Sequence, residues 1–558
     1  MKAAPDEGGG GVPDERRIEG TNAPLRCGEA TMQLLRDYGV DTVFGIPGFH
    51  TLELYRGLAQ SGIRHILTRN EQGAGFMADG YARASGRPGV CVTISGPGVT
   101  NASTAVGQAY ADSVPLLLLS STNESASLGK GWGCLHETAD QQRLTEPITA
   151  FSRTALAPED VPELLGQAFG SFATGRPRPV HVAVPLDVLE APVAGRWAAR
   201  VLPARPLAPR EAIRAAAALL ADAQRPVLIV GGGAVTGGSA VTALAEWLDA
   251  SVIATNAGKG VVPDSHPLSL GGGLIRQAVR DHLAEADVIL ALGTELAPTD
   301  SFVPRLPIGG RLIRVDIDPR KLNDAYPAEA GILGDAAEAA AALLAVLEES
   351  VGAPRQGGGR ARVAAVRRRM LGGLSPVERQ HKAVWDALRA VLPPEAIIWG
   401  DISRIVYTGS AVMPVDLPRR WVYPAGFGAL GCAVPSAIGA RIACPDTPVV
   451  AVAGDGGFMF TVQELMTAAE LRLPIPVVIW NDEGYGMIRA GMDAAGMVRT
   501  ADSPLTPDFA RLAEGLGCYF ARPKTAESVQ AAVTAALTAD APTLIVVDEG
   551  AGWLSGER

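Results

Sequence analysis

Short runs of apolar residues alternate with longer amphipathic stretches along most of the chain. Residues 448–453 and 476–480 are runs of the first kind, and residues 462–471 between them have the apolar spacing of a helix. Strand-length runs that are apolar throughout are typical of parallel strands covered on both faces by helices. The alternation therefore predicts an α/β fold built from parallel sheets.

Two segments interrupt this alternation. Residues 191–210 are rich in Pro, Ala and Arg, and residues 352–369 contain three consecutive glycines among several arginines. Taken as linkers, they divide the chain into blocks 25–190, 205–350 and 375–550, each expected to be a doubly wound parallel-sheet domain. Residues 1–24 combine glycine, proline and charge without apolar periodicity, and we expect them to be a disordered extension.

A faint internal repeat relates the two outer blocks at an offset of 358 positions. Ala82-Arg83 aligns with Ala440-Arg441, and Gly96-Pro97-Gly98 aligns with Gly454-Asp455-Gly456. Chance can produce so few identities, but a helix, a strand and a Gly-x-Gly turn recur in the same order. Duplication is the better interpretation, and two related domains could then face each other with a cofactor between them.

Composition excludes several classes of function. The chain has 558 residues, of which 47% are hydrophobic and 19% charged, an ordinary balance for a globular protein. Its net charge is −10 and no basic stripe is present, which argues against nucleic-acid binding. No apolar run approaches the ~20 residues that a membrane-spanning helix needs. The six cysteines are scattered and are expected to be reduced thiols in a cytoplasmic protein.

Oxygen-bearing side chains follow two apolar runs of the third block. Asp455 lies in a glycine-rich turn after the first run, and Asn481-Asp482 follows the second. The carboxyl ends of parallel strands are where open α/β sheets bind ligands. Carboxylate oxygens beside glycine N–H groups suit a hard divalent cation that carries a diphosphate.

This arrangement resembles the signature of thiamine-diphosphate enzymes: Gly-Asp-Gly, a spacer of 24 residues, then an Asn-Asn-like pair. The resemblance covers about residues 25–550. It implies Mg²⁺ held by the side chains of Asp455 and Asp482 and by the carbonyl of Gly484. Most members have Asn where this chain has Asp482, so an extra negative charge faces the diphosphate. The other cofactor-binding positions that the resemblance implies are Pro47, Gly48, Ile402, Ser403, Gly428, Leu430, Gly454, Gly456, Gly457, Tyr485, Gly486 and Met487.

The first block carries a candidate catalytic carboxylate, Glu71, at the start of a predicted helix. By itself, an acid at this position could serve only the helix dipole. Family members carry Arg-His-Glu-Gln there, and their Glu bonds N1′ of the cofactor's aminopyrimidine. The resemblance implies that role for Glu71, although this chain has Asn70 in place of the His.

The middle block shows a weak signal for a nucleotide. Gly231-Gly-Gly233 follows an apolar run, but no Gly-x-Gly-x-x-Gly with a later acid is present. Flavin-binding acetolactate synthases share this block and usually read Met-Leu-Gly-Met-His-Gly after the equivalent of His266–Gly271. This chain reads Gly272-Gly273-Leu274-Ile275, which argues against FAD, and we interpret the block as structural.

The most distinctive local sequence for the choice of substrate lies in residues 126–138 and 45–55. They most resemble the family members that decarboxylate 5-guanidino-2-oxopentanoate to an aldehyde, whereas acetolactate synthases have Phe-Gln-Glu where this chain has Leu135-His136-Glu137. The alternative is a carboligase of the acetolactate synthase type, which joins the decarboxylated 2-oxo acid to a carbonyl acceptor.

Candidate residues follow from that choice. His136 and His50 are candidate proton-transfer groups, and Glu137 or Asp140 could bind a guanidinium. Alternatively, Glu137 could be a helix-capping acid and His136 could only bond backbone. The remaining positions expected to shape the substrate pocket are Phe49 and Ile488. The resemblance also implies a homodimer or homotetramer with its active sites at subunit interfaces.

Overall fold

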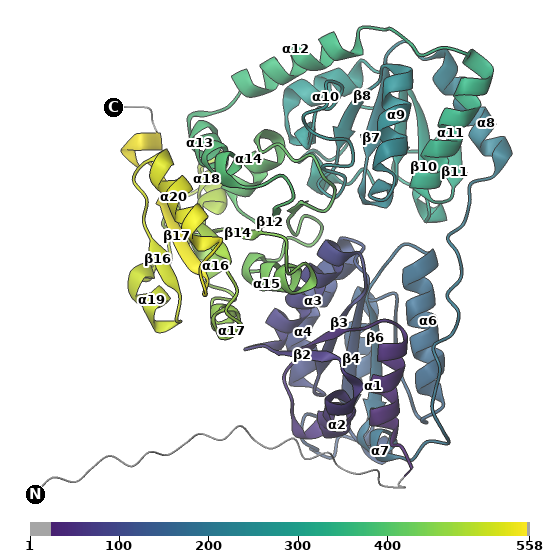
Figure 1. Cartoon of the computed structure of the whole chain (residues 1–558), viewed down its shortest axis with the longest axis vertical. Helices are drawn as coiled ribbons and strands as arrows, with labels where there is room; N and C mark the ends of the chain where they lie inside the picture. The colour runs from purple at the N-terminus through teal and green to yellow at the C-terminus, as the bar shows by residue number, and fades with distance from the viewer. Residues whose placement is uncertain (1–23, 555–558) are drawn as a thin grey trace, which may run out of the picture.

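The computed structural model describes residues 24–554, so the predicted extension lies, except for residue 24, outside the described residues. The described part contains three sheets, each with helices on both sides (Figure 1). All strand pairs within these sheets are parallel, which confirms the predicted α/β class. Figure 1 shows the first sheet below, the central sheet above and the third sheet beside them.

The first sheet has six strands in the order β2-β1-β3-β4-β6-β5. Apart from β2 and β5, its strands are fully buried, as their apolar runs predict. The strands are β1 Thr42–Gly45, β2 Arg64–Leu67, β3 Gly89–Thr93, β4 Leu116–Thr122, β5 Phe151–Thr154 and β6 Val180–Pro185. The helices are α1 Cys27–Asp37, α2 Leu52–Ser61, α3 Glu71–Ser85, α4 Pro97–Ala111, α5 Gln141–Thr145, α6 Asp160–Thr174 and α7 Leu186–Glu190.

The central sheet has five strands in the order β11-β10-β9-β7-β8. Its strands are β7 Pro226–Val230, β8 Ser251–Ala254, β9 Val288–Leu292, β10 Arg311–Asp316 and β11 Ala330–Leu333. Its helices are α8 Arg210–Asp222, α9 Gly238–Leu248, α10 Gln277–Ala284 and α11 Ala336–Val351. The second predicted linker is helical from Gly359 onward, because α12 Gly359–Gly372 packs against α10.

The third sheet has six strands in the order β13-β12-β14-β15-β17-β16. Its strands are β12 Ile397–Gly400, β13 Trp421–Val422, β14 Val449–Gly454, β15 Pro476–Asn481, β16 Tyr519–Ala521 and β17 Thr543–Asp548. Its helices are α13 Pro376–Val391, α14 Arg404–Val412, α15 Ala433–Ala443, α16 Asp455–Phe458, α17 Glu464–Glu470, α18 Gly486–Ala494, α19 Phe509–Gly515 and α20 Ala526–Ala536.

The first and third sheets have the same strand order, which supports the duplication inferred from the repeat. Their helices α3 and α15 pack together as a pair (Figure 1). A Cβ on Gly80 would overlap the carbonyl oxygen of Ser436, and one on Gly439 would overlap that of Met77. The two glycines therefore let the helix backbones touch, and one hydrophobic core continues through both domains.

Within residues 24–554 no helix combines the length and the apolar character needed to cross a bilayer.

Candidate functional site

Glu71 begins α3 and lies beside the turn that leaves β3. Asn70 caps this helix by accepting a hydrogen bond from the Gln72 N–H at 2.8 Å. The Glu71 side chain is 8% exposed, and its Oε2 accepts a hydrogen bond from Asn101 Nδ2 at 2.9 Å. A Cβ on Gly98 would lie 3.6 Å from Oε1 of Glu71, so the glycine turn passes directly beside the carboxylate.

Two histidines from separate loops meet at the same turn. His50 follows β1 and His136 lies between β4 and α5, yet their ring centroids are 5.0 Å apart. Nδ1 of His50 lies 2.5 Å from Oγ of Ser95, and Nδ1 of His136 lies 3.3 Å from the carbonyl oxygen of Ser95. Burial lowers the pKa of His50, and the neighbouring His136 lowers it further.

The backbone at this turn is held in a restricted conformation. His136 has φ +61°, which is uncommon for a side chain of this size, and Gly96 has φ +60°. A Cβ on Gly96 would overlap the carbonyl oxygen of His136. The Gln141 side chain accepts a hydrogen bond from the Gly96 N–H at 2.8 Å and donates one to the Ser121 carbonyl at 2.8 Å. The loop that carries His136 is thus tied to the sheet.

Both acids predicted to bind substrate have local partners. The Glu137 carboxylate accepts hydrogen bonds from four backbone N–H groups of its own loop, at positions 131–134 and 2.7–3.3 Å. Desolvation opposes ionisation, but these donors outweigh it and lower the pKa of Glu137. Asp140 caps α5 by accepting from the Arg143 N–H at 2.9 Å. Glu137 therefore organises the loop, whereas the carboxylate of Asp140 accepts fewer hydrogen bonds and has more capacity for another partner.

Asp455 and Asp482 lie together at the carboxyl edge of the third sheet. Oδ2 of Asp455 accepts a hydrogen bond from the Gly484 N–H at 2.8 Å, whereas its Oδ1 is buried without a hydrogen-bond partner. Burial raises the pKa of Asp455, and the adjacent Asp482 raises it further. An orphaned carboxylate oxygen beside a second carboxylate is a donor set that a divalent cation would complete.

Two arginines hold the loop that contains Asp482. Arg489 donates hydrogen bonds to the carbonyls of Asp482 and Glu483, each at 3.1 Å. Nη1 of Arg404 lies 3.6 Å from Oδ2 of Asp482. Glu483 has φ +57° and Gly484 has φ +143°, so the turn needs such support.

Two loops that carry predicted cofactor-binding positions are joined by a residue that was not predicted from the sequence. Asp401 is buried, and its carboxylate accepts hydrogen bonds from the Ile402 N–H at 2.7 Å and the Gly431 N–H at 2.9 Å. Burial raises the pKa of Asp401 to about 6. Asp401 directly follows a strand, as Asp455 does, and that position could have identified it. Oγ of Ser403 is buried and unpartnered, which suits a phosphate oxygen.

A second missed residue, Glu464, connects the two outer domains. Its carboxylate accepts hydrogen bonds from the backbone N–H groups of Arg69 at 3.1 Å and Asn70 at 3.0 Å, immediately before Glu71. Burial raises the pKa of Glu464 to about 7. No local pattern indicates this contact, because the partners are separated by 394 or 395 positions.

The glycine turn of the central block is explained by packing. A Cβ on Gly231 would overlap the backbone of Gly293, and one on Gly233 would lie 2.8 Å from the Cα of Gly293. These glycines are needed for close approach of two backbone segments, whatever else they contact.

The comparison with protein families agrees with this geometry. Residues 25–144 match the N-terminal TPP binding domain of thiamine pyrophosphate enzymes, residues 213–343 match the central domain, and residues 401–547 match the C-terminal TPP binding domain. The chain belongs to the thiamine pyrophosphate enzyme family. Thiamine diphosphate, another name for the same compound, is therefore its cofactor.

Individual relatives in this family divide into two groups. The chain is 50% identical over 526 residues to a probable 2-ketoarginine decarboxylase of Pseudomonas aeruginosa, with 93% of each chain covered. It is 34% identical to an acetolactate synthase of Mycobacterium bovis, covering 90% of this chain and 85% of the relative. It is 32% identical to the large subunit of acetolactate synthase isozyme 1 of Escherichia coli, with 93% of each chain covered.

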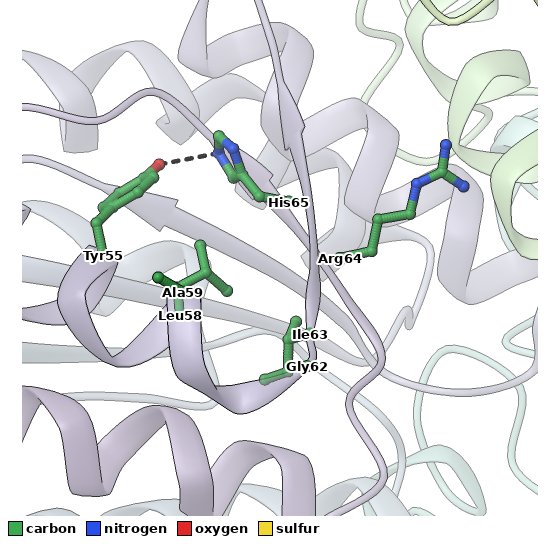
Figure 2. Close-up of a pocket in the computed structure, with 7 residues that line it drawn as sticks. All are labelled: Tyr55, Leu58, Ala59, Gly62, Ile63, Arg64 and His65. Carbon is green, nitrogen blue, oxygen red and sulfur yellow. Dashed lines mark hydrogen bonds between the residues drawn. The ribbon is translucent and has the colours of Figure 1, made fainter. Parts of the chain in front are cut away.

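The structure leaves several predicted positions exposed rather than gathered in a pocket. Phe49 is 85% exposed, and Met487 and Ile488 at the start of α18 are each about half exposed. The cavity in Figure 2, of about 420 Å³, lies elsewhere, between α2 and β2. Two of its polar side chains are already paired with each other, since Tyr55 Oη lies 3.0 Å from Nε2 of His65.

Proposed function

We propose that the protein catalyses the non-oxidative decarboxylation of a 2-oxo acid to an aldehyde, with 5-guanidino-2-oxopentanoate as the substrate. The observation that carries this proposal is the pair of histidines, His50 and His136, gathered at the turn beside Glu71. Release of an aldehyde needs a proton delivered after CO₂ leaves, and imidazoles are suited to that transfer near neutral pH. The identity of 50% with the probable 2-ketoarginine decarboxylase supports the same substrate, because 2-ketoarginine is 5-guanidino-2-oxopentanoate.

The cofactor end of the proposed site is the third sheet. Thiamine diphosphate, when bound, supplies the electron sink for the loss of CO₂. Asp455, Asp482 and the Gly484 carbonyl would hold Mg²⁺, and the unpartnered Oδ1 of Asp455 and Oγ of Ser403 fit a metal-bound diphosphate. Further cofactor contacts are proposed for Ile402, Gly428, Leu430, Gly454, Gly456, Gly457, Tyr485, Gly486 and Met487, with Pro47 and Gly48 from the first domain.

Glu71 is proposed to bond the aminopyrimidine of the cofactor and to exchange a proton with it. Asn101 donates a hydrogen bond to the carboxylate on one side, and Gly98 places no side chain next to it on the other. Glu464 fixes the backbone before Glu71, so the carboxylate is positioned by two domains of one chain.

For the substrate's guanidinium, Asp140 is proposed as the partner in preference to Glu137. Its side chain is 48% exposed, and its ion-pair partner Arg143 is 3.9 Å away and largely exposed, so a bound cation could replace it. Phe49 and Ile488 are proposed to line the apolar part of the substrate pocket, because both are exposed apolar side chains beside the two halves of the site.

A second copy of the chain is proposed to complete the site. Among the hydrogen bonds and ion pairs of residues 24–554, none joins the Glu71 and histidine group to the Asp455 and Asp482 group. Apolar side chains are exposed beside both groups, including Trp132 and Leu135 near the first and Ile488 near the second. A homodimer or homotetramer would cover them. Cytoplasmic location, absence of bound flavin and absence of nucleic-acid or membrane partners stay predictions from the sequence.

Product analysis tests the proposed reaction. The purified protein with thiamine diphosphate and Mg²⁺ would be given 5-guanidino-2-oxopentanoate or pyruvate, and the products identified by mass spectrometry. We expect 4-guanidinobutanal and CO₂ from the first substrate and little turnover of the second.

The 32–34% identity with acetolactate synthases supports one alternative, a carboligase. Formation of acetolactate from pyruvate, with no aldehyde from the guanidino acid, would establish that alternative and overturn the decarboxylase proposal.

A further inference from the structure

Ser95 lies between the two histidines and bonds each through a different group. Its hydroxyl faces Nδ1 of His50 at 2.5 Å, and its carbonyl oxygen faces Nδ1 of His136 at 3.3 Å. The residue is fully buried in the turn after β3, and its N–H donates to Oγ of Ser121 at 3.1 Å. Ser95, which is held in place by its burial and this hydrogen bond, thus contacts the Nδ1 atom of each imidazole.

The carbonyl oxygen of Ser95 determines which ring nitrogen of His136 carries the hydrogen. A carbonyl oxygen only accepts hydrogen bonds, so Nδ1 of His136 must carry the hydrogen in this contact. In the neutral imidazole, Nε2 of His136 then has no hydrogen and is a proton acceptor.

The hydroxyl group of Ser95 sets the opposite tautomer on His50. Among the residues that the structure describes, His50 Nδ1 is the one acceptor within hydrogen-bond distance of Ser95 Oγ. A buried hydroxyl proton without an acceptor is costly, by about 1–3 kcal/mol, so Ser95 donates to Nδ1 of His50. The neutral ring of His50 then carries its hydrogen on Nε2 and is a proton donor there.

We propose that Ser95 is a positioning residue that holds His50 and His136 in opposite tautomers and so makes an acid and a base from two identical side chains. Neither Nε2 has a hydrogen-bond partner within residues 24–554, and neither is among the buried unpartnered atoms, so both reach solvent. The catalytic use of this pair rests on the proposed function, whereas the tautomers themselves do not.

The test is ¹⁵N NMR of the full-length protein with thiamine diphosphate and Mg²⁺, labelled on histidine and sedimented for solid-state measurement at pH 7.5. The chain has seven histidines, and the His50→Gln and His136→Gln variants assign the two signals. We expect His50 to be protonated on Nε2 and His136 on Nδ1. The same tautomer for both residues, or the reverse assignment, would overturn the proposal, whether or not the protein decarboxylates any substrate.

Ser95→Ala provides a second, directional test. It removes the hydroxyl and keeps the carbonyl, so the His50 signals should shift toward a mixture of tautomers while those of His136 stay unchanged. His181, which is bonded by the hydroxyls of Ser120, Thr145 and Ser152 in the same domain, is an internal reference for intact folding. Unchanged His50 signals in Ser95→Ala would contradict the proposed hydroxyl contact.

Turnover extends the test to function. For Ser95→Ala we expect kcat to fall about 10- to 100-fold with KM changed less than about threefold, since proton transfer and not binding is affected. Ser103→Ala removes a hydroxyl that donates to the Thr100 carbonyl on the exposed side of α4 and should leave kcat unchanged. Equal kcat values for the two variants would show that Ser95 has no positioning role in turnover.

Discussion

The first and third domains share one strand order but present different chemistry at the same turn. After β3 the first domain has Ser95 and Pro97. At the corresponding positions of the repeat, the third domain has Ala453 within β14 and Asp455 directly after it. Ser95 contacts two histidines, whereas Asp455 pairs with Asp482. In our proposal, the turn of the first domain thus positions proton-transfer groups, and the equivalent turn of the third domain binds a metal ion.

The comparison also explains why the two halves need each other. The turn of the first domain lies beside Glu71, His50 and His136, and the turn of the third lies beside Asp482. Helices α3 and α15 join the copies within one chain, and Glu464 of the third domain holds the backbone before Glu71 of the first. The side chains at the two turns differ, and so do their partners from other loops, which are His50 and His136 in the first domain and Asp482 in the third.

The largest expected effect is at the proton-transfer half. Glu71→Gln keeps the size of the side chain but cannot accept a proton, so kcat should fall about 10²- to 10⁴-fold. Calorimetry should show thiamine diphosphate still bound, because the third domain is unchanged. Glu53→Gln, a buried carboxylate of α2 paired with Arg26 and Arg56, should keep turnover, and normal turnover in Glu71→Gln would remove the role assigned to Glu71.

Substitutions at the proposed metal ligands should change the affinity for thiamine diphosphate. Asp455→Ala removes a proposed Mg²⁺ ligand and should weaken thiamine diphosphate binding by at least about 100-fold. Asp482→Asn keeps an oxygen ligand and relieves repulsion with Asp455, so affinity should change less than about 10-fold. Titration of the cofactor at fixed Mg²⁺ measures both variants. If the two lose affinity equally, the assignment of distinct roles to the two carboxylates is wrong.

Substitutions where α3 of the first domain packs on α15 of the third should change the stability of the protein. Gly439→Ala places a methyl group against the Met77 carbonyl and should lower the free energy of unfolding by about 1–3 kcal/mol. Gly170→Ala is the control, because no atom lies within 4 Å of a Cβ at that position of α6. It should raise stability by about 0.5–1 kcal/mol. Urea unfolding compares the two, and equal effects would contradict close packing of α3 on α15.

Each of the two outer domains also carries a buried neutral histidine, and these should affect stability only as the pH falls. Burial lowers the pKa of His181 and of His381 to about 3. Between pH 6.5 and 3 only the unfolded chain binds these protons, so stability is lost as pH falls. From pH 7 to pH 5 each histidine should account for about 2 kcal/mol.

His181→Gln and His381→Gln should each reduce that acid sensitivity by a similar amount, measured by urea unfolding at the two pH values. An unchanged difference between pH 7 and pH 5 in both variants would show that these histidines are not the cause.

The parts of the site that directly follow a strand could be predicted from the local sequence. The parallel α/β class, and the turns that carry Gly96 and Asp455, follow from apolar runs and glycines. The proposed role of Glu71 needed the family resemblance, since an acid that begins a helix can also serve the helix dipole. The position of His136 near His50 was not predictable, because it depends on how the loop after β4 folds over the turn after β3.

The contacts that position these residues were missed for a related reason. Ser95, Asn101 and Gln141 are small or polar residues without a distinctive pattern, and their partners come from other loops. Glu137 was predicted as a substrate residue or a helix cap, but the structure shows it bonding four consecutive backbone N–H groups of its own loop. Its substrate role remains a prediction, and the spacing 131–137 alone did not reveal the loop geometry.

The central claim is that an active site combines Glu71 of one subunit with Asp455 of another, and complementation in trans tests it most directly. Glu71→Gln and Asp455→Ala subunits with different affinity tags would be co-expressed, and the mixed oligomers purified through both tags. If sites form between subunits, a mixed dimer has one site with both halves intact, and its turnover should reach about half of the wild-type value. If each site lies within one chain, every site carries a defect, and mixed oligomers as inactive as either parent would contradict the account.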